Sequence, residues 1–133
     1  MRNLRYAIAP LIGTLELMNP NDLHWTESNI ESVSVTGRSL AVVASGVFVL
    51  GQVGARRVKV TYTGVAQAQQ ETTEYVGDPK APAGFKHPKT AQLVEPIALT
   101  DTSNFGLEGI AMFEPVSWLD IEIKAQGATV EEL

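Results

Sequence analysis

The sequence contains no cysteine. Disulfide bonds, thiolate nucleophiles and thiolate-bound zinc are therefore excluded, and the absence fits a reducing compartment or a virion. The chain also has only two histidines, His24 and His87. Histidine is the side chain that most often serves as a general base or a non-thiolate metal ligand. These shortages argue against enzyme chemistry.

Motifs that carry catalysis are missing as well. No serine lies in a Gly-x-Ser-x-Gly turn, and the glycines of "GQVGARR" are too few to hold a phosphate. His24 lies two residues after Asp22 and beside Trp25. We interpret it as a loop histidine that packs on an aromatic ring, rather than as half of a metal or acid–base pair. The sequence therefore predicts no catalytic residue, no cofactor and no metal, and a protein that is not an enzyme.

The segment Asp101–Gly109, "DTSNFGLEG", gathers oxygen donors as a calcium loop does. Phe105, however, stands where a third acidic or amide ligand belongs. A turn whose Asp, Ser and Asn side chains form local hydrogen bonds explains the pattern more simply. A weak calcium site over 101–108 remains the alternative.

Positive charge is also in short supply. Ten basic residues stand against fifteen acidic residues, which gives a net charge of −5. A compact acidic domain repels phosphate backbones unless its basic groups are focused on one face. We therefore expect no direct binding to nucleic acid.

Only one long hydrophobic run is present, Ser39–Ala55, which carries no charge. Its seventeen residues lie at the lower limit for a spanning helix, and its glycines and β-branched residues favour strands. We expect one long or two short strands, which either are buried on both faces or change face at Gly46.

The N-terminal stretch 1–20 carries no predicted signal peptide, because Pro10, Gly13 and Glu16 interrupt its apolar residues. Neither this stretch nor the long hydrophobic run predicts a transmembrane protein. We expect the protein in a virion or in the cytoplasm of the producing cell.

Period-two alternation of apolar and polar residues dominates the chain and indicates strands with one buried face. The expected strands are Leu4–Ala9, Ile12–Leu17, Ile30–Thr36, Leu40–Leu50, Arg57–Val65, Thr72–Val76, Gln92–Leu99, Phe105–Met112 and Val116–Ala125. The residues expected to be largely buried are Val33, Val35, Val58, Val60, Leu119, Ile121 and Ile123. Trp118, Asp120, Glu122 and Lys124 alternate with the last three and should face outward.

Eight or nine strands without crossover helices predict an all-β, single-domain antiparallel β-sandwich over residues 1–133, jelly-roll-like or immunoglobulin-like. A small β-barrel is the alternative. One short helix is expected at most, with Asn19 as its cap and Pro20 at its first position. Gly109 predicts a bulge, and Pro96 predicts an edge strand or a bulge.

The segment Tyr75–Thr90, "YVGDPKAPAGFKHPKT", departs from this pattern. It holds three of the seven prolines and three of the five lysines. Proline restricts the chain to extended conformations, and long loops without secondary structure are usually functional or disordered. We interpret the segment as an extended arm that contacts a partner protein. The alternative is a loop folded back on its own domain, anchored by Phe85.

The lysines of the arm are complementary to acidic residues of the same chain, namely Asp120, Glu122, Glu131 and Glu132. Contact between an arm and the next subunit would build a homo-oligomer or a larger, capsid-like assembly; contact within one subunit is equally allowed. The expected function is therefore a non-enzymatic structural or assembly protein, such as a phage head-decoration or minor capsid protein.

A carbohydrate-binding module is the alternative function, because exposed aromatic side chains bind sugars or anchor protein interfaces. Trp25 is expected in a loop and Trp118 on an outward face. The candidate interaction residues for either function are Lys80, Phe85, Lys86, His87, Lys89, Trp25 and Trp118.

Overall fold

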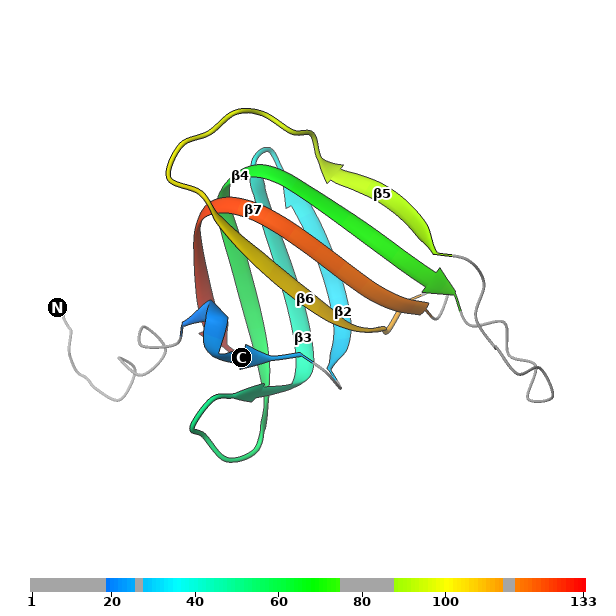
Figure 1. The fold of residues 1–133 in the computed structure, drawn as a ribbon. Coiled ribbons are helices and arrows are strands. Elements are labelled where there is room, and N and C mark those ends of the chain that lie inside the picture. Colours follow the sequence, from blue (N-terminus) through cyan, green and yellow to red (C-terminus); the bar gives the residue numbers. More distant parts are fainter. Residues whose placement is uncertain (1–18, 26–27, 75–87, 114–116) are drawn as a thin grey trace, which may run out of the picture.

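The computed structural model describes residues 19–25, 28–74, 88–113 and 117–133. Within these ranges the chain is almost entirely β, with one short 3-10 helix and seven strands (Figure 1). The helix η1 is Pro20–Asp22; the strands are β1 (Leu23–His24), β2 (Asn29–Thr36), β3 (Ser39–Val49), β4 (Ala55–Glu74), β5 (Lys89–Val94), β6 (Ser103–Ala111) and β7 (Ser117–Glu132). The predicted all-β class is confirmed.

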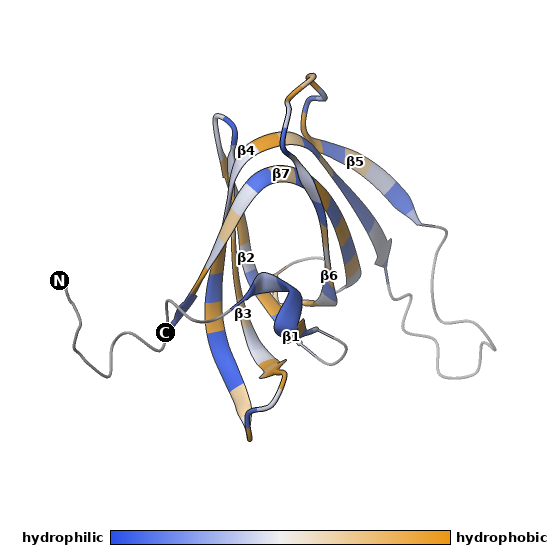
Figure 2. Ribbon diagram, turned by 60° about the vertical axis from the view of Figure 1, so that its left-hand side comes forward, coloured by the Kyte–Doolittle hydropathy of each residue, from blue (hydrophilic) through white to orange (hydrophobic). Residues whose placement is uncertain are grey.

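The strands form one sheet in the order β1–β3–β2–β6–β7–β4–β5, and β3 also pairs with β4. The pairings therefore run round a ring that closes where Asn29 and Ile30 pair with Ile110 and Ala111. This closing pair of β2 with β6 is parallel, whereas the other pairings of the described strands are antiparallel as expected. The arrangement is sandwich-like, because β4 and β7 bend so that their two halves lie in facing layers (Figures 1 and 2).

The bend in β4 has a local cause. Gly64 has a φ of 57°, and the register against β7 shifts between Val65 and Gln67 directly after it. Glycine adopts this left-handed conformation without steric cost, and a register shift bends a strand and increases its twist. One strand of 20 residues therefore serves both layers.

The continuity of β4 corrects the sequence prediction. The expected strands Arg57–Val65 and Thr72–Val76 are parts of this one strand, as far as Glu74, where the description stops. The linking residues 66–71 are alanine, glutamine and glutamate, which lack the side chains that are enriched in strands. They are extended because β7 and β5 pair with them on both sides.

The other expected strands agree with the structure to different degrees. β2, β3 and β6 begin and end within two residues of their predicted limits. β7 continues past Ala125 to Glu132, because it pairs there with the first half of β4. β5 is an edge strand, as Pro96 implied, but it begins at Lys89 and ends before the proline. The expected strands Leu4–Ala9 and Ile12–Leu17 lie outside the described residues.

The long hydrophobic run forms strand β3 and the turn after it. Leu40, Val42 and Ala44 are buried, and then Val47 and Val49 are buried, so the inward phase changes at Gly46. Gly46 has a φ of 71°, and the register against β4 shifts between Ala44 and Val47. The predicted change of face at Gly46 is confirmed. In the part of the chain that the structure describes, no helix is long and apolar enough to cross a membrane.

The core contains five of the seven residues expected to be buried, namely Val58, Val60, Leu119, Ile121 and Ile123. Val33 is only partly buried and Val35 is 42% exposed, so the prediction for Val35 is wrong. Val35 does lie opposite the buried Leu40. Its position near the β2–β3 turn, away from the short pairing of β2 with β6, leaves it uncovered.

Two further local predictions have different outcomes. Asn19 caps η1, and its side chain accepts a hydrogen bond from the Asn21 N–H at 2.9 Å, as expected. Gly109, in contrast, is not at a bulge, because it pairs in regular register with Leu119. A Cβ atom at Gly109 would lie 2.5 Å from Ser28 Oγ. The glycine is therefore needed where β6 passes close to the buried Ser28.

The core assignment predicts different costs for two truncations. Ile121→Ala should lower the free energy of unfolding by about 2–5 kcal/mol, because it removes buried methyl groups and leaves a cavity. Val35→Ala should lower it much less, because Val35 is half exposed. Urea denaturation of both variants measures the difference, and equal losses would show that the inward face is assigned wrongly.

Tyr62 should make stability depend on alkaline pH. Burial raises the pKa of Tyr62 well above its ordinary value of about 10. Above that pH the unfolded chain releases the proton while the folded chain keeps it, so the free energy of unfolding falls as pH rises. Below it, the contribution of Tyr62 is fully present. Tyr62→Phe should therefore lose less stability than the wild type between about pH 9 and about pH 11 in urea titrations; parallel curves would contradict this.

Candidate functional site

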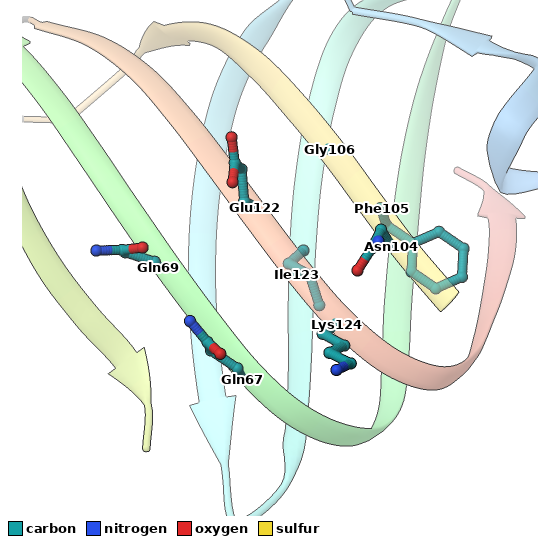
Figure 3. A pocket seen from close by; sticks show the side chains of 8 residues that line it. All are labelled: Gln67, Gln69, Asn104, Phe105, Gly106, Glu122, Ile123 and Lys124. Atoms are coloured by element: carbon teal, nitrogen blue, oxygen red, sulfur yellow. The ribbon is translucent and has the colours of Figure 1, made fainter. Parts of the chain in front are cut away.

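The most distinctive surface of the molecule is the face of β6, β7 and β4 that points away from the core, here called the outer face. Antiparallel register places residues of the three strands side by side on it. From one end to the other, the rows are Asn104–Lys124–Gln67, Gly106–Glu122–Gln69, Glu108–Asp120–Glu71 and Ile110–Trp118–Thr73. Figure 3 shows the side chains of the first two rows and their neighbours.

The third row, Glu108–Asp120–Glu71, is here called the acidic row. It places three carboxylates on neighbouring strands, with Glu122 on the adjacent row and Lys124 as the one basic side chain of the four rows. Within the described ranges, none of these four carboxylates forms a salt bridge. Like charges directly opposite one another in a sheet are destabilising. The outer face therefore carries uncompensated negative charge.

Two carboxylates elsewhere in the sheet are paired with arginine. Arg57 donates hydrogen bonds to Glu31 at 2.8–3.1 Å and lowers the pKa of that carboxyl group. Arg56 donates to Glu132 at 2.9 Å. Both pairs lie away from the four rows of the outer face. These two carboxylates therefore have arginine partners, whereas the three carboxylates of the acidic row have no described basic partner.

The outer face carries a hollow of about 150 Å³ over Glu71, Thr90 and Asp120, and two larger hollows that adjoin each other. One hollow of about 460 Å³ lies over Gln67, Gln69, Asn104, Glu122 and Lys124 (Figure 3). The other, of about 310 Å³, lies between β6 and residues 23–25 and reaches Asp120. Gly106 and Glu122 line both hollows. The two hollows therefore adjoin at Gly106, and they are together called the trough.

One end of the outer face is apolar. Trp118 is partly buried and lies opposite Ile110, which is exposed. Met112 and Phe113 follow along the chain, and both are exposed. An aromatic side chain beside exposed apolar groups is the usual anchor of a protein interface. Another exposed apolar group, made of Phe48, Leu50 and Val53, lies at the turn between β3 and β4.

The structure separates the predicted interaction residues. Trp118 faces outward as expected, but Trp25 is only 7% exposed and packs in the core, so its expected exposure is wrong. The Trp25 carbonyl accepts a hydrogen bond from the Ser28 N–H at 2.8 Å, and its ring belongs to the core cluster. Lys89 is exposed at the start of β5; its register partner is Thr72, which faces the opposite side from Glu71. Lys80, Phe85, Lys86 and His87 lie outside the described residues.

The weaker sequence candidates do not converge on a site. His24 is exposed in β1, while the neighbouring Trp25 ring belongs to the core. From Ser103 to Glu108 the chain runs along β6, which spreads the proposed calcium donors over roughly 17 Å. The described ranges contain no group of three or more His, Asp or Glu side chains that could hold a metal ion.

Sequence alternation identified Asp120, Glu122 and Lys124 as outward-facing but missed their neighbours Glu71 and Glu108. Those two belong to strands far apart in sequence, and only the register of β4 and β6 on β7 brings them together. Gly106 was missed for the same reason. Its signal was a glycine inside an alternating segment, which indicates a close approach of backbone or ligand.

The acidic row yields a test of its own. Asp120→Asn should raise the free energy of unfolding by up to about 1 kcal/mol, because it relieves repulsion from Glu108 and Glu71. The gain should shrink at high salt, which screens exposed charges. As a matched control, Glu131→Gln removes a carboxylate opposite Lys59 and should not stabilise. Thermal melts at low and high salt measure both; a destabilised Asp120→Asn would mean that Asp120 has an attractive partner.

Comparisons of the chain with protein-family models, with curated proteins and with solved structures find no match. The chemistry of the outer face therefore has to carry the functional assignment. That chemistry is a band of uncompensated carboxylates beside an apolar patch, with a trough between strands.

Proposed function

We propose that the protein is a non-enzymatic assembly protein whose outer face binds a basic segment of a neighbouring subunit. The observation that carries this proposal is the acidic row, Glu108–Asp120–Glu71, whose three carboxylates lie side by side without a described basic partner. A sheet that places like charges opposite one another loses stability. A basic partner would offset that loss, so the repulsion in the free subunit favours association.

Charge and apolar area would have separate roles in the complex. Carboxylates on an exposed face steer a cationic partner and orient it, but such pairs contribute little affinity. Affinity would come from apolar area, and Trp118 with Ile110 supplies it at the end of the acidic row. An interface with an aromatic anchor and a charged rim is the common design of specific protein contacts.

The proposed partner is the arm Tyr75–Thr90 of a second copy. Its three lysines match the sign of the outer face, and its prolines limit the conformations that are lost on docking. A contact from one surface of each subunit to a different surface of the next one is heterologous and builds rings or lattices. A virion is the proposed setting, for example as a phage head-decoration or minor capsid protein, where many copies of one chain repeat the same contact.

One alternative is supported by the hollow in Figure 3, namely a carbohydrate-binding module. Gln67, Gln69 and Asn104 offer amide donors and acceptors that suit sugar hydroxyl groups. The aromatic platform is weaker, because the Phe105 ring packs against Tyr62 with centroids 5.4 Å apart and Trp25 is buried. A monomer that binds in a glycan screen would favour this function over assembly.

Assembly is tested by sedimentation velocity across protein and salt concentrations. The wild type should associate, and the association should weaken as salt rises. Glu122→Lys should weaken it on the order of tenfold, because it reverses charge on the outer face. Glu95→Lys makes the same charge change at an exposed position after β5 and is the matched control, expected to associate like the wild type.

The arm is tested in the same experiment. Phe85→Ala should weaken association more than Lys80→Ala, Lys86→Ala or Lys89→Ala singly, because a buried aromatic dominates a small interface. Replacing Pro79–Lys89 by a short glycine turn should leave a β circular-dichroism spectrum but abolish association. If this shortened protein associates like the wild type, the arm is not the assembly element.

A further inference from the structure

Gly106 has no structural reason to be glycine. It lies inside β6, where glycine is less stable than alanine by roughly 0.5–1 kcal/mol. Its φ is not positive, and among the described residues a Cβ atom there would meet only the Ile121 carbonyl oxygen, at 4.0 Å. Gly109, three residues later, differs: its Cβ would clash with Ser28. The fold of this chain explains Gly109 but leaves Gly106 unexplained.

The position of Gly106 gives it another use. The two larger hollows of the outer face meet at Gly106 and Glu122, so the missing side chain keeps the trough continuous. On one side lie Gln67 and Gln69 of β4, and on the other lie residues 23–25. A glycine inside a strand marks a place where a ligand or another backbone approaches closely. The trough is therefore open to an extended chain that crosses β6.

The backbone of Gly106 also offers hydrogen-bonding groups to such a chain. The N–H groups of Ile110 and Met112 donate to Ser28 and Ile30, on the side of β6 away from β7. Groups of a strand alternate sides with a period of two, so the N–H and C=O of Gly106 point to that side as well. Among the described residues, no strand pairs with β6 there before Ile110.

The walls of the trough specify the charge of its occupant. Glu108, Asp120 and Glu122 line it, against Lys124 alone. The other described basic side chains do not reach the trough. The three arginines already have partners: Arg56 pairs with Glu132, Arg57 pairs with Glu31, and Arg38 donates to backbone carbonyls. Lys59 lies opposite Glu131, and Lys89 faces the other side of the sheet. The basic residues that remain are Lys80 and Lys86 of the arm and Arg2 and Arg5 of the N-terminal stretch. The two lysines are the better candidates, because the prolines around them favour an extended chain.

We propose that the trough over Gly106 is the docking site for the arm of a second copy, with residues 83–87, "AGFKH", lying across β6. This rests on the proposed function and names the place and manner of the contact. The segment is free of proline and bounded by Pro82 and Pro88, so it can donate and accept backbone hydrogen bonds along its length. In an extended chain Lys86 and Phe85 point to opposite sides. Lys86 then meets Glu122, while Phe85 lies on the opposite side of the docked segment.

Gly106→Val is the decisive variant. It should keep the melting temperature at or above that of the wild type, because the site has room and valine favours strands. It should nevertheless weaken association on the order of tenfold or more, because the side chain closes the trough. Thr129→Val adds a valine to an exposed position on the other half of β7 and should associate normally. Normal association of Gly106→Val overturns the proposal.

Amide hydrogen exchange of the wild type identifies the occupant. The Gly106 amide should exchange fast in the dilute monomer and slowly in the assembled protein. The Gly106 amide could instead exchange slowly in the monomer and become fast when Pro79–Lys89 is replaced. That result would mean that the arm fills the trough of its own subunit, and it would overturn the second-copy contact. Association that survives this replacement but is lost on removing residues 1–18 would overturn the arm as occupant.

The outcomes separate this inference from the proposed function. If Glu122→Lys prevents association while Gly106→Val does not, the outer face assembles by another contact and only the trough is wrong. If the wild type stays monomeric at every concentration and salt, assembly itself is refuted and the trough contact with it.

Discussion

The pairing of β4 with β7 is the constraint on which the rest of the structure depends. It runs from Val58–Glu132 to Thr73–Trp118 and beyond, through the bend at Gly64. Every other strand joins one half of this pair or is attached to a strand that does. Because side chains alternate along a strand, the same register that buries Val60 and Ile121 also decides which polar residues meet on the opposite side. The register of β4 against β7 therefore determines both the composition of the core and the composition of the outer face.

This coupling explains why the acidic row persists in a stable sheet. A shift of β7 by one residue would separate Asp120 from Glu71, but it would also turn Leu119, Ile121 and Ile123 toward solvent. Burial of each such side chain is worth about 1.5–3 kcal/mol, whereas repulsion between exposed carboxylates is worth about 1 kcal/mol or less. Burial of the core side chains therefore determines the register, even though this register places carboxylates opposite one another on the outer face. The repulsion can be reduced by salt, which screens exposed charges, or by the basic partner proposed above.

The same reasoning shows how far the sequence leads. Alternation alone was sufficient for the inward phase of β7 and for the change of face in β3, because Ile121 and Gly46 carry their signal locally. Alternation failed where neighbouring strands determine the conformation or the burial of a residue. Residues 66–71 have no strand-like pattern, yet they form a strand because two other strands pair with them. Val35 follows the alternation, but among the described residues no other element covers its side chain. Trp25 was misplaced because a loop position says nothing of where a ring points. The candidate site was half visible, as Asp120 and Glu122, since its other members come from strands whose register no local pattern reveals.

Gly106 and Gly109 show how one strand can serve stability and recognition separately. Both are glycines inside β6, and because they are three residues apart they lie on opposite faces of the strand. Gly109 lies on the inward side against the buried Ser28, where a side chain would collide with the fold itself. Gly106 lies on the outward side, level with Glu122, where a side chain would collide with none of the residues that the structure describes. Selection for a stable fold alone would fill the second position with a strand-forming residue, since glycine there weakens the strand. Gly106 instead lies where two hollows of the outer face meet, and the proposed docking of the arm would give a glycine at this position a role.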